Sequence, residues 1–177
     1  MAEPPRLSEI LLPCDKSIVY FVALCVKERR HVLANPKMFE AIRAVLTELR
    51  KWHFLAGVLM PDHAHFVITR AEDRGLSVGD FATGFKRLLR KTLGPQAWEW
   101  QRGCFDRLLR SDEDLQSKWI YVQENPVRKR LVKHWEQWPY YLDLIDKEGS
   151  YQLPQQGDGK LTPTLQEGGK LTASPAV

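Results

Sequence analysis

The alternation of apolar and polar positions divides the chain into short strand-like runs and longer helical stretches. Residues 18–26 are rich in β-branched and aromatic side chains, which is typical of a buried strand. Two further apolar runs, 54–60 and 63–69, are separated by a Pro-Asp pair that is typical of a tight turn. A fourth strand is predicted over residues 104–109.

Helical periodicity fills the intervals between these strands. Asn35 followed by Pro36 predicts a helix start, because Asn caps helices and Pro suits the first helical position. Ser77 with Asp80 forms a capping box for a second helix. The order β-α-β-β-α-β predicts an α+β, ferredoxin-like fold with an antiparallel four-stranded sheet.

An additional C-terminal helix is predicted after the fourth strand, at a second capping box formed by Ser111 and Asp114. Tyr121 and Asn125 stand four residues apart on this helix, so they share one face. Pro126 disfavours helical geometry at the residue before it, which places both side chains in the last turn of the helix.

Composition predicts one folded domain with extensions at both ends. The 177 residues are 44% hydrophobic and 27% charged, as in ordinary globular proteins. We expect an N-terminal arm over 1–16, a domain over 17–149 and a flexible tail over 150–177, where Gly and Pro are frequent and Gly-Lys-Leu-Thr occurs twice. The net charge of +4 lies entirely before residue 150, and a basic body suits a phosphate-rich partner.

Cysteine usage and hydropathy predict a cytoplasmic protein. The three cysteines are odd in number and form no Cys-x-x-Cys pair, which indicates reduced thiols. The longest apolar run is far too short to cross a bilayer, and the first residues lack a secretory apolar region. We therefore expect no membrane association.

A histidine pair is the most informative chemical feature. His63 and His65 stand two apart in a predicted strand, so their imidazoles point to one face, roughly 7 Å apart at Cα. Two imidazoles, a phenol and an amide are the parts of a metal-assisted nucleophile, in which Tyr121 attacks phosphorus while a divalent cation polarises the phosphate. With nitrogen and oxygen ligands from His63, His65 and Asn125, the expected ion is Mg²⁺ or Mn²⁺, the latter accepting histidine more readily.

Each of these features alone is more often structural. A histidine in a strand is usually incidental, a tyrosine on a helix usually packs, and Asn before Pro usually belongs to a turn. A zinc hydrolase would also use His-x-His. However, Phe66, Val67 and Ile68 follow where such a hydrolase needs Asp and His. The combination favours chemistry on a phosphodiester.

Two basic stretches are candidates for contact with the DNA backbone. The first comprises Lys86, Arg87, Arg90 and Lys91, and the second comprises Arg128, Lys129 and Arg130. Solvated helix faces are the alternative for both stretches. The second lies just after Tyr121 in the sequence, which favours phosphate contact there.

Several motifs resemble a known family. Met-Pro-Asp-His-Ala-His-Phe at 60–66 resembles the metal-binding HUH motif of single-tyrosine HUH transposases. Trp-Gln-Arg-Gly-Cys-Phe-Asp-Arg at 100–107, Tyr-Val-Gln-Glu-Asn-Pro-Val-Arg at 121–128 and Trp-Pro-Tyr at 138–140 resemble the REP-associated tyrosine transposases. The motifs occur in family order from about residue 17 to residue 141.

The resemblance implies a transposase-like endonuclease and strand transferase that cuts single-stranded DNA near hairpins or palindromic repeats. It further implies a phosphotyrosine on the 5′ end of the cut, a free 3′ hydroxyl and a location at the nucleoid. By this resemblance His63 and His65 are metal ligands, Tyr121 is the catalytic nucleophile and Asn125 is the third ligand. Monomer and homodimer both stay open. The alternative function is a non-catalytic DNA-binding regulator of the same fold.

Overall fold

The computed structural model describes residues 18–71, 75–109 and 112–144. The predicted N-terminal arm, the predicted tail and Ser111 of the second capping box lie outside these residues. The described elements are β1 (Val19–Cys25), a 3₁₀ turn (Lys27–Arg29), α1 (Pro36–Glu48), β2 (Trp52–Leu59), β3 (His63–Arg70), α2 (Val78–Leu93), β4 (Phe105–Leu109), α3 (Asp112–Arg128), a second 3₁₀ turn (Trp135–Gln137) and β5 (Tyr141–Asp143).

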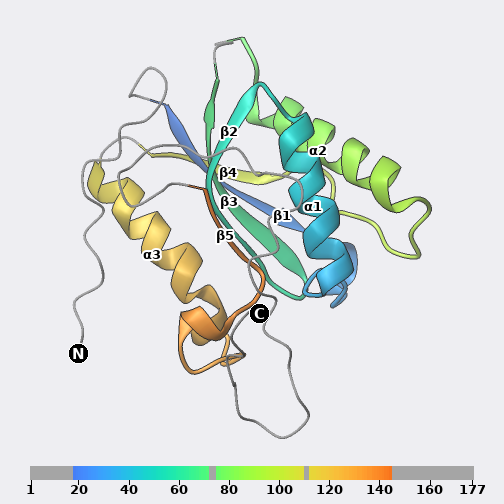
Figure 1. Cartoon of the computed structure of the whole chain (residues 1–177). Coiled ribbons are helices and arrows are strands. Elements are labelled where there is room, and N and C mark those ends of the chain that lie inside the picture. Colours follow the sequence, from blue (N-terminus) through green and yellow to red (C-terminus); the bar gives the residue numbers. More distant parts are fainter. Residues whose placement is uncertain (1–17, 72–74, 110–111, 145–177) are drawn as a thin grey trace, which may run out of the picture.

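The strands form one antiparallel sheet in the order β4-β1-β3-β2-β5. Helices α1 and α2 cover one face of this sheet and α3 covers the other (Figure 1). The predicted ferredoxin-like arrangement with an added C-terminal helix is confirmed. No described helix is both long and apolar enough to span a membrane.

The sheet differs from the prediction by a fifth strand. β5 pairs with the free edge of β2, with Leu142 opposite Gly57. The indole Nε1 of Trp138 donates a hydrogen bond to the Leu59 carbonyl, 2.9 Å away, and docks the chain just before β5. A strand of three residues is too short to produce a detectable apolar period, which is why sequence patterning missed it.

Alternation along β3 assigns its side chains to two different cores. Ala64, Phe66 and Ile68 lie in the core beneath α1 and α2, whereas Val67 lies in the core beneath α3. The two histidines share the parity of Val67 and therefore face α3. A register shift between Phe54 and Ala56 in β2 inserts one extra residue and preserves this two-sided packing along the neighbouring strand.

The helix starts follow the capping signals. The Asn35 side chain accepts from the Met38 amide at 2.9 Å, and Ser77 and Asp80 form the expected reciprocal capping box. The end of α3 corrects the prediction, because the helix continues through Pro126 to Arg128. Asn125 is thus in the last turn, but Tyr121 lies one turn earlier.

We predict that Gly57→Ala destabilises the fold. A Cβ at Gly57 would lie 2.8 Å from Phe66 Cδ1 and 3.2 Å from the His65 carbonyl oxygen, so the sheet beside the histidines must shift. Overpacking of this kind costs about 1–3 kcal/mol. The free energy of unfolding in urea measures the loss.

Gly84→Ala in α2 is the matched control. Its Cβ would lie 3.5 Å from Leu49 Cδ2, which is an ordinary contact, and Ala favours a helix over Gly by up to about 1 kcal/mol. The control should be neutral or stabilising. Equal stability of the two variants would contradict the close-packing account of Gly57.

Candidate active site

His63 and His65 lie side by side on the face of β3 that α3 covers. Their ring centroids are 4.7 Å apart and their planes are nearly perpendicular. Both side chains are buried, with 8% and 6% of their surface exposed. The His65 ring also stacks on Phe21 of β1 at a centroid distance of 5.0 Å. The imidazoles are therefore held at fixed positions by packing before any ligand binds.

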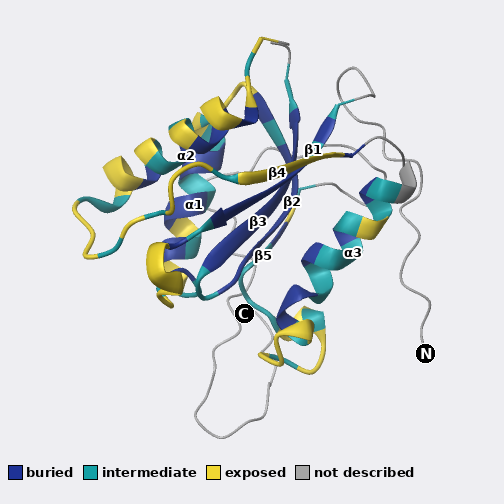
Figure 2. Ribbon diagram, turned by 180° about the vertical axis from the view of Figure 1, so that it is seen from behind, coloured by how far each residue is buried: buried dark blue, intermediate teal, exposed yellow. Residues whose placement is uncertain are grey.

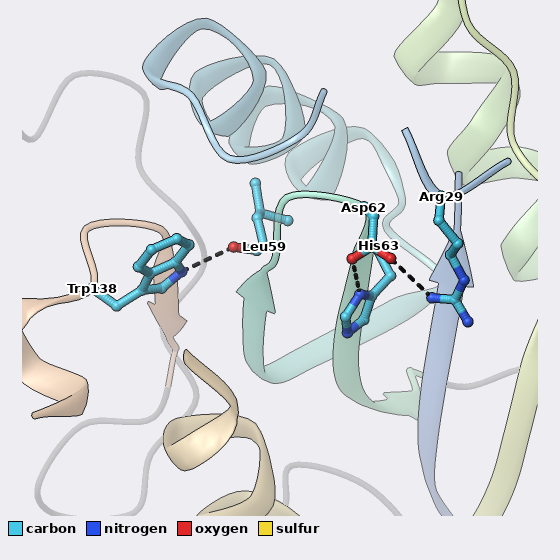
Figure 3. A network of polar contacts seen from close by, with 5 residues as sticks. All are labelled: Arg29, Leu59, Asp62, His63 and Trp138. Carbon is cyan, nitrogen blue, oxygen red and sulfur yellow. Dashed lines mark hydrogen bonds and ion pairs between the residues drawn. The ribbon is translucent and has the colours of Figure 1, made fainter. Parts of the chain in front are cut away.

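A carboxylate orients His63. The Nδ1–H of His63 donates to Asp62 Oδ1 at 2.6 Å, and Arg29 Nη1 donates to Asp62 Oδ2 at 3.3 Å (Figure 3). With Nδ1 engaged, the lone pair of His63 is on Nε2. Carboxylates hold many metal-binding histidines in this way and raise their basicity as ligands.

The electrostatics of this group keep His63 neutral and Asp62 charged. Burial lowers the pKa of His63, although the hydrogen bond and charge of Asp62 oppose the shift. For Asp62, burial raises the pKa, but the hydrogen bond from His63 and the positive charge of Arg29 outweigh it, and the net pKa is lowered. Glu28 and Arg29 both have positive φ, at 58° and 53°, which is unfavourable for side-chain-bearing residues. The 3₁₀ turn thus presents Arg29 to Asp62 at a cost in backbone energy.

His65 has a buried polar atom that is available to a ligand. Its Nδ1 atom is buried and has no hydrogen-bond partner among the described residues. Burial, followed by the charges of His63 and Arg29, lowers its pKa to about 3, so the ring is neutral at neutral pH. A buried polar atom without a partner costs free energy unless a ligand or water satisfies it. The two neutral imidazoles of His63 and His65 are suitable ligands for a divalent cation.

Tyr121 lies against the histidine pair. Its ring centroid is 5.5 Å from that of His65 and 5.7 Å from that of Phe21. Two cations flank the same ring: Lys118 Nζ is 5.2 Å and the Arg128 guanidinium carbon 5.1 Å from its centroid. The two positive charges beside the Tyr121 ring therefore come from the same face of α3.

Asn125 occupies the next position of that stripe, one turn beyond Tyr121. It is 3% exposed, so its amide is removed from solvent. Among the described residues no group of three or more His, Cys, Asp or Glu could hold an ion. Within the described part of the chain, a third protein ligand to a cation at the histidine pair would therefore come from another residue type, and the Asn125 amide oxygen is the predicted candidate.

The two predicted basic stretches lie on opposite faces of the sheet. Arg128 joins the tyrosine, and Lys129 and Arg130 are exposed just beyond it. On α2, Arg87 and Arg90 line a cavity of about 540 Å³ together with Arg102 and Trp98, and Lys91 is exposed.

Lys86 has a structural task on α2. Its ammonium donates hydrogen bonds to the carbonyls of Gln101 and Gly103 and so holds the segment that leads into β4 against α2. Burial lowers its pKa. Its contact with DNA stays a prediction, as it does for the other basic residues.

Sequence patterning missed three members of this region. Arg29 is 33 positions from Asp62, so only the fold reveals their pairing. Lys118 was detectable, because it stands at i−3 from Tyr121 on the predicted helix. Asp62 stands next to His63 in the sequence, but the Pro-Asp pair predicts only a turn there.

Comparisons of sequence and of structure with known proteins agree with the motifs. No model of a known protein family matches the chain. A protein of Haemophilus influenzae named "Putative REP-associated tyrosine transposase" is 24% identical over 139 residues, which cover 71% of this chain and 79% of the relative. A solved structure of a REP-associated tyrosine transposase bound to a REP hairpin has a TM-score of 0.61 at 21% identity and covers 80% of this chain and 82% of that chain. The resemblance that the motifs indicate is confirmed: in sequence and in fold, the chain is similar to the REP-associated tyrosine transposases.

Proposed function

We propose that this chain cuts and rejoins single-stranded DNA beside hairpins, with Tyr121 as the nucleophile. The observation that carries the proposal is the packing of the Tyr121 ring against His65, which itself lies against His63. The structural relative bound to a REP hairpin supports hairpin DNA as the substrate class.

In the proposed reaction the phenol oxygen of Tyr121 attacks the scissile phosphorus after losing its proton. A bond forms between this oxygen and phosphorus while the bond to the 3′ oxygen breaks, and the proton that the phenol gave up to water is balanced by one that the 3′ oxygen takes from water. The products are a 5′-phosphotyrosine and a 3′ hydroxyl. Lys118 and Arg128 beside the ring favour the negatively charged phosphate that approaches it. Attack by a 3′ hydroxyl on the phosphotyrosine reverses the step and joins strands.

His63, His65 and Asn125 would hold Mg²⁺ or Mn²⁺. When bound, the ion would polarise the phosphate and neutralise part of its charge. The residues themselves are suited to this task, because two neutral imidazoles and an amide add no negative charge to the site.

The direct test is nicking of a hairpin-bearing oligonucleotide with a single-stranded extension, in Mg²⁺ and in Mn²⁺. Site-specific cleavage with a covalent protein–DNA adduct supports the proposal. Tight hairpin binding without cleavage in either metal would support the alternative, a non-catalytic DNA-binding regulator.

Tyr121→Phe should abolish cleavage and leave folding and DNA binding intact, because only one oxygen is removed. Mass spectrometry of the wild-type adduct should locate the DNA on the peptide that contains Tyr121. Tyr140→Phe is the control, since Tyr140 packs against Phe39 and Trp138 and should tolerate the change. Normal nicking by Tyr121→Phe would overturn the assignment.

Asp62→Asn should weaken Mn²⁺ binding by about 10- to 100-fold, because the carboxylate orients His63. Calorimetric titration of the DNA-free protein measures this without reference to activity. Glu99→Gln is the matched acidic control, since the Glu99 carboxylate forms an exposed ion pair with Lys27. Equal Mn²⁺ affinity of Asp62→Asn and wild type would show that the ion does not bind at this histidine.

A further inference from the structure

Phe105 at the start of β4 is the most exposed large hydrophobic side chain among the described residues, with 62% of its surface accessible. Figure 2 shows β4 exposed over most of its length, beyond the area that α3 covers. Edge strands more often carry charged side chains than aromatic ones, because apolar edges promote aggregation. An aromatic ring at this position therefore requires an explanation.

The sheet register places Phe105 on the same face as the histidine pair. Ala23 of β1 lies directly opposite Phe105 on one side and opposite His65 on the other. Paired residues in antiparallel strands point to the same face, and two strand spacings amount to about 10 Å. Only the small side chain of Ala23 stands between the phenyl ring and the His65 imidazole in this row.

Positive charge lies one row further along the same face. Arg107, two residues after Phe105, is exposed and pairs with Phe21. Lys118 of α3 reaches the same place, with its Nζ 5.4 Å from the Phe21 ring centroid. An open aromatic ring next to two cations, beside a candidate phosphate site, matches the alternating bases and phosphates of a single strand.

We propose that Phe105 is a stacking platform for an unpaired base of the strand held at the histidine pair. The inference rests on the proposed function and deepens it by assigning the base next to the reacting phosphate a binding position. Arg107 and Lys118 contact the phosphate between this base and the site. Stacking is tolerant of base identity, so this position contributes affinity and alignment more than sequence readout.

The test compares three variants of the full chain in binding to a hairpin oligonucleotide with a single-stranded extension, in EDTA to prevent cleavage. Phe105→Ala should weaken binding by about 5- to 100-fold, which is the range for loss of one aromatic stack. Phe105→Trp should retain or improve affinity. Leu108→Ala is the matched control, because Leu108 is 38% exposed on the same strand but points to the opposite face.

Abasic substitution along the extension locates the stacked base. At one position, base removal should weaken wild-type binding by the same factor as Phe105→Ala and should add nothing to the Phe105→Ala loss. This non-additivity is the signature of a direct pair, and a general loss of folding would not produce it. Melting temperatures confirm that the exposed substitutions leave the fold intact.

The outcomes separate this inference from the proposed function. If wild type nicks the hairpin strand but Phe105→Ala binds it as well as Leu108→Ala does, the stacking platform alone is overturned. If Phe105→Ala changes the sedimentation coefficient without changing DNA affinity, the ring belongs to a protein interface and the inference falls. If wild type binds no hairpin DNA, the proposed function falls first and this inference with it.

Discussion

The two-residue alternation of β3 is the constraint on which the rest of the molecule depends. It sends Phe66 and Ile68 into the core beneath α1 and α2, and it directs His63 and His65 to the face that α3 covers. A slip of one residue would exchange the two sets, burying the imidazoles among phenyl rings and turning Phe66 and Ile68 toward α3. The pairing with β1 and β2 on both sides, and the close fit of Phe66 over Gly57, prevent that slip.

Burial of two imidazoles against α3 has an electrostatic consequence. Both pKa values are lowered, so neither ring carries charge near neutrality. The charge of Asp62 opposes the shift at both rings, but Asp62 forms a hydrogen bond only with His63 of the two. His65 retains a buried nitrogen without a partner in the described part of the chain. A core selected for stability alone would satisfy or replace such an atom. Departures of this kind from the rule that buried polar atoms are hydrogen-bonded concentrate at functional sites.

Much of the fold was predictable because it follows local rules. Ser77 with Asp80, and Asn35 with Pro36, started helices where capping chemistry requires them, and the two-residue period of β3 placed His63 beside His65. What escaped prediction depends on distant partners. β5 forms because Trp138 docks on Leu59. The contact between Asp62 and Arg29 requires a turn with positive φ angles, which no residue pattern predicts. Helix α3 continues through Pro126, although the residue before a proline ordinarily avoids helical geometry. The Pro126 carbonyl accepts a hydrogen bond from the Leu131 amide.

The two faces of the sheet divide stability from chemistry. Beneath α1 and α2 the core is a cluster of mutually packed aromatic rings, with Phe54, Phe66, Phe81 and Phe85 each in contact with others of the set. Beneath α3 the core is interrupted by polar groups, and the helix is held mainly by Leu115, Trp119 and Val122. Truncation in the aromatic cluster leaves large cavities and threatens the whole fold. Substitution of the polar groups beneath α3 leaves that cluster intact. The face beneath α1 and α2 therefore supplies the free energy of folding that allows the face beneath α3 to carry strained, charged and unpartnered groups.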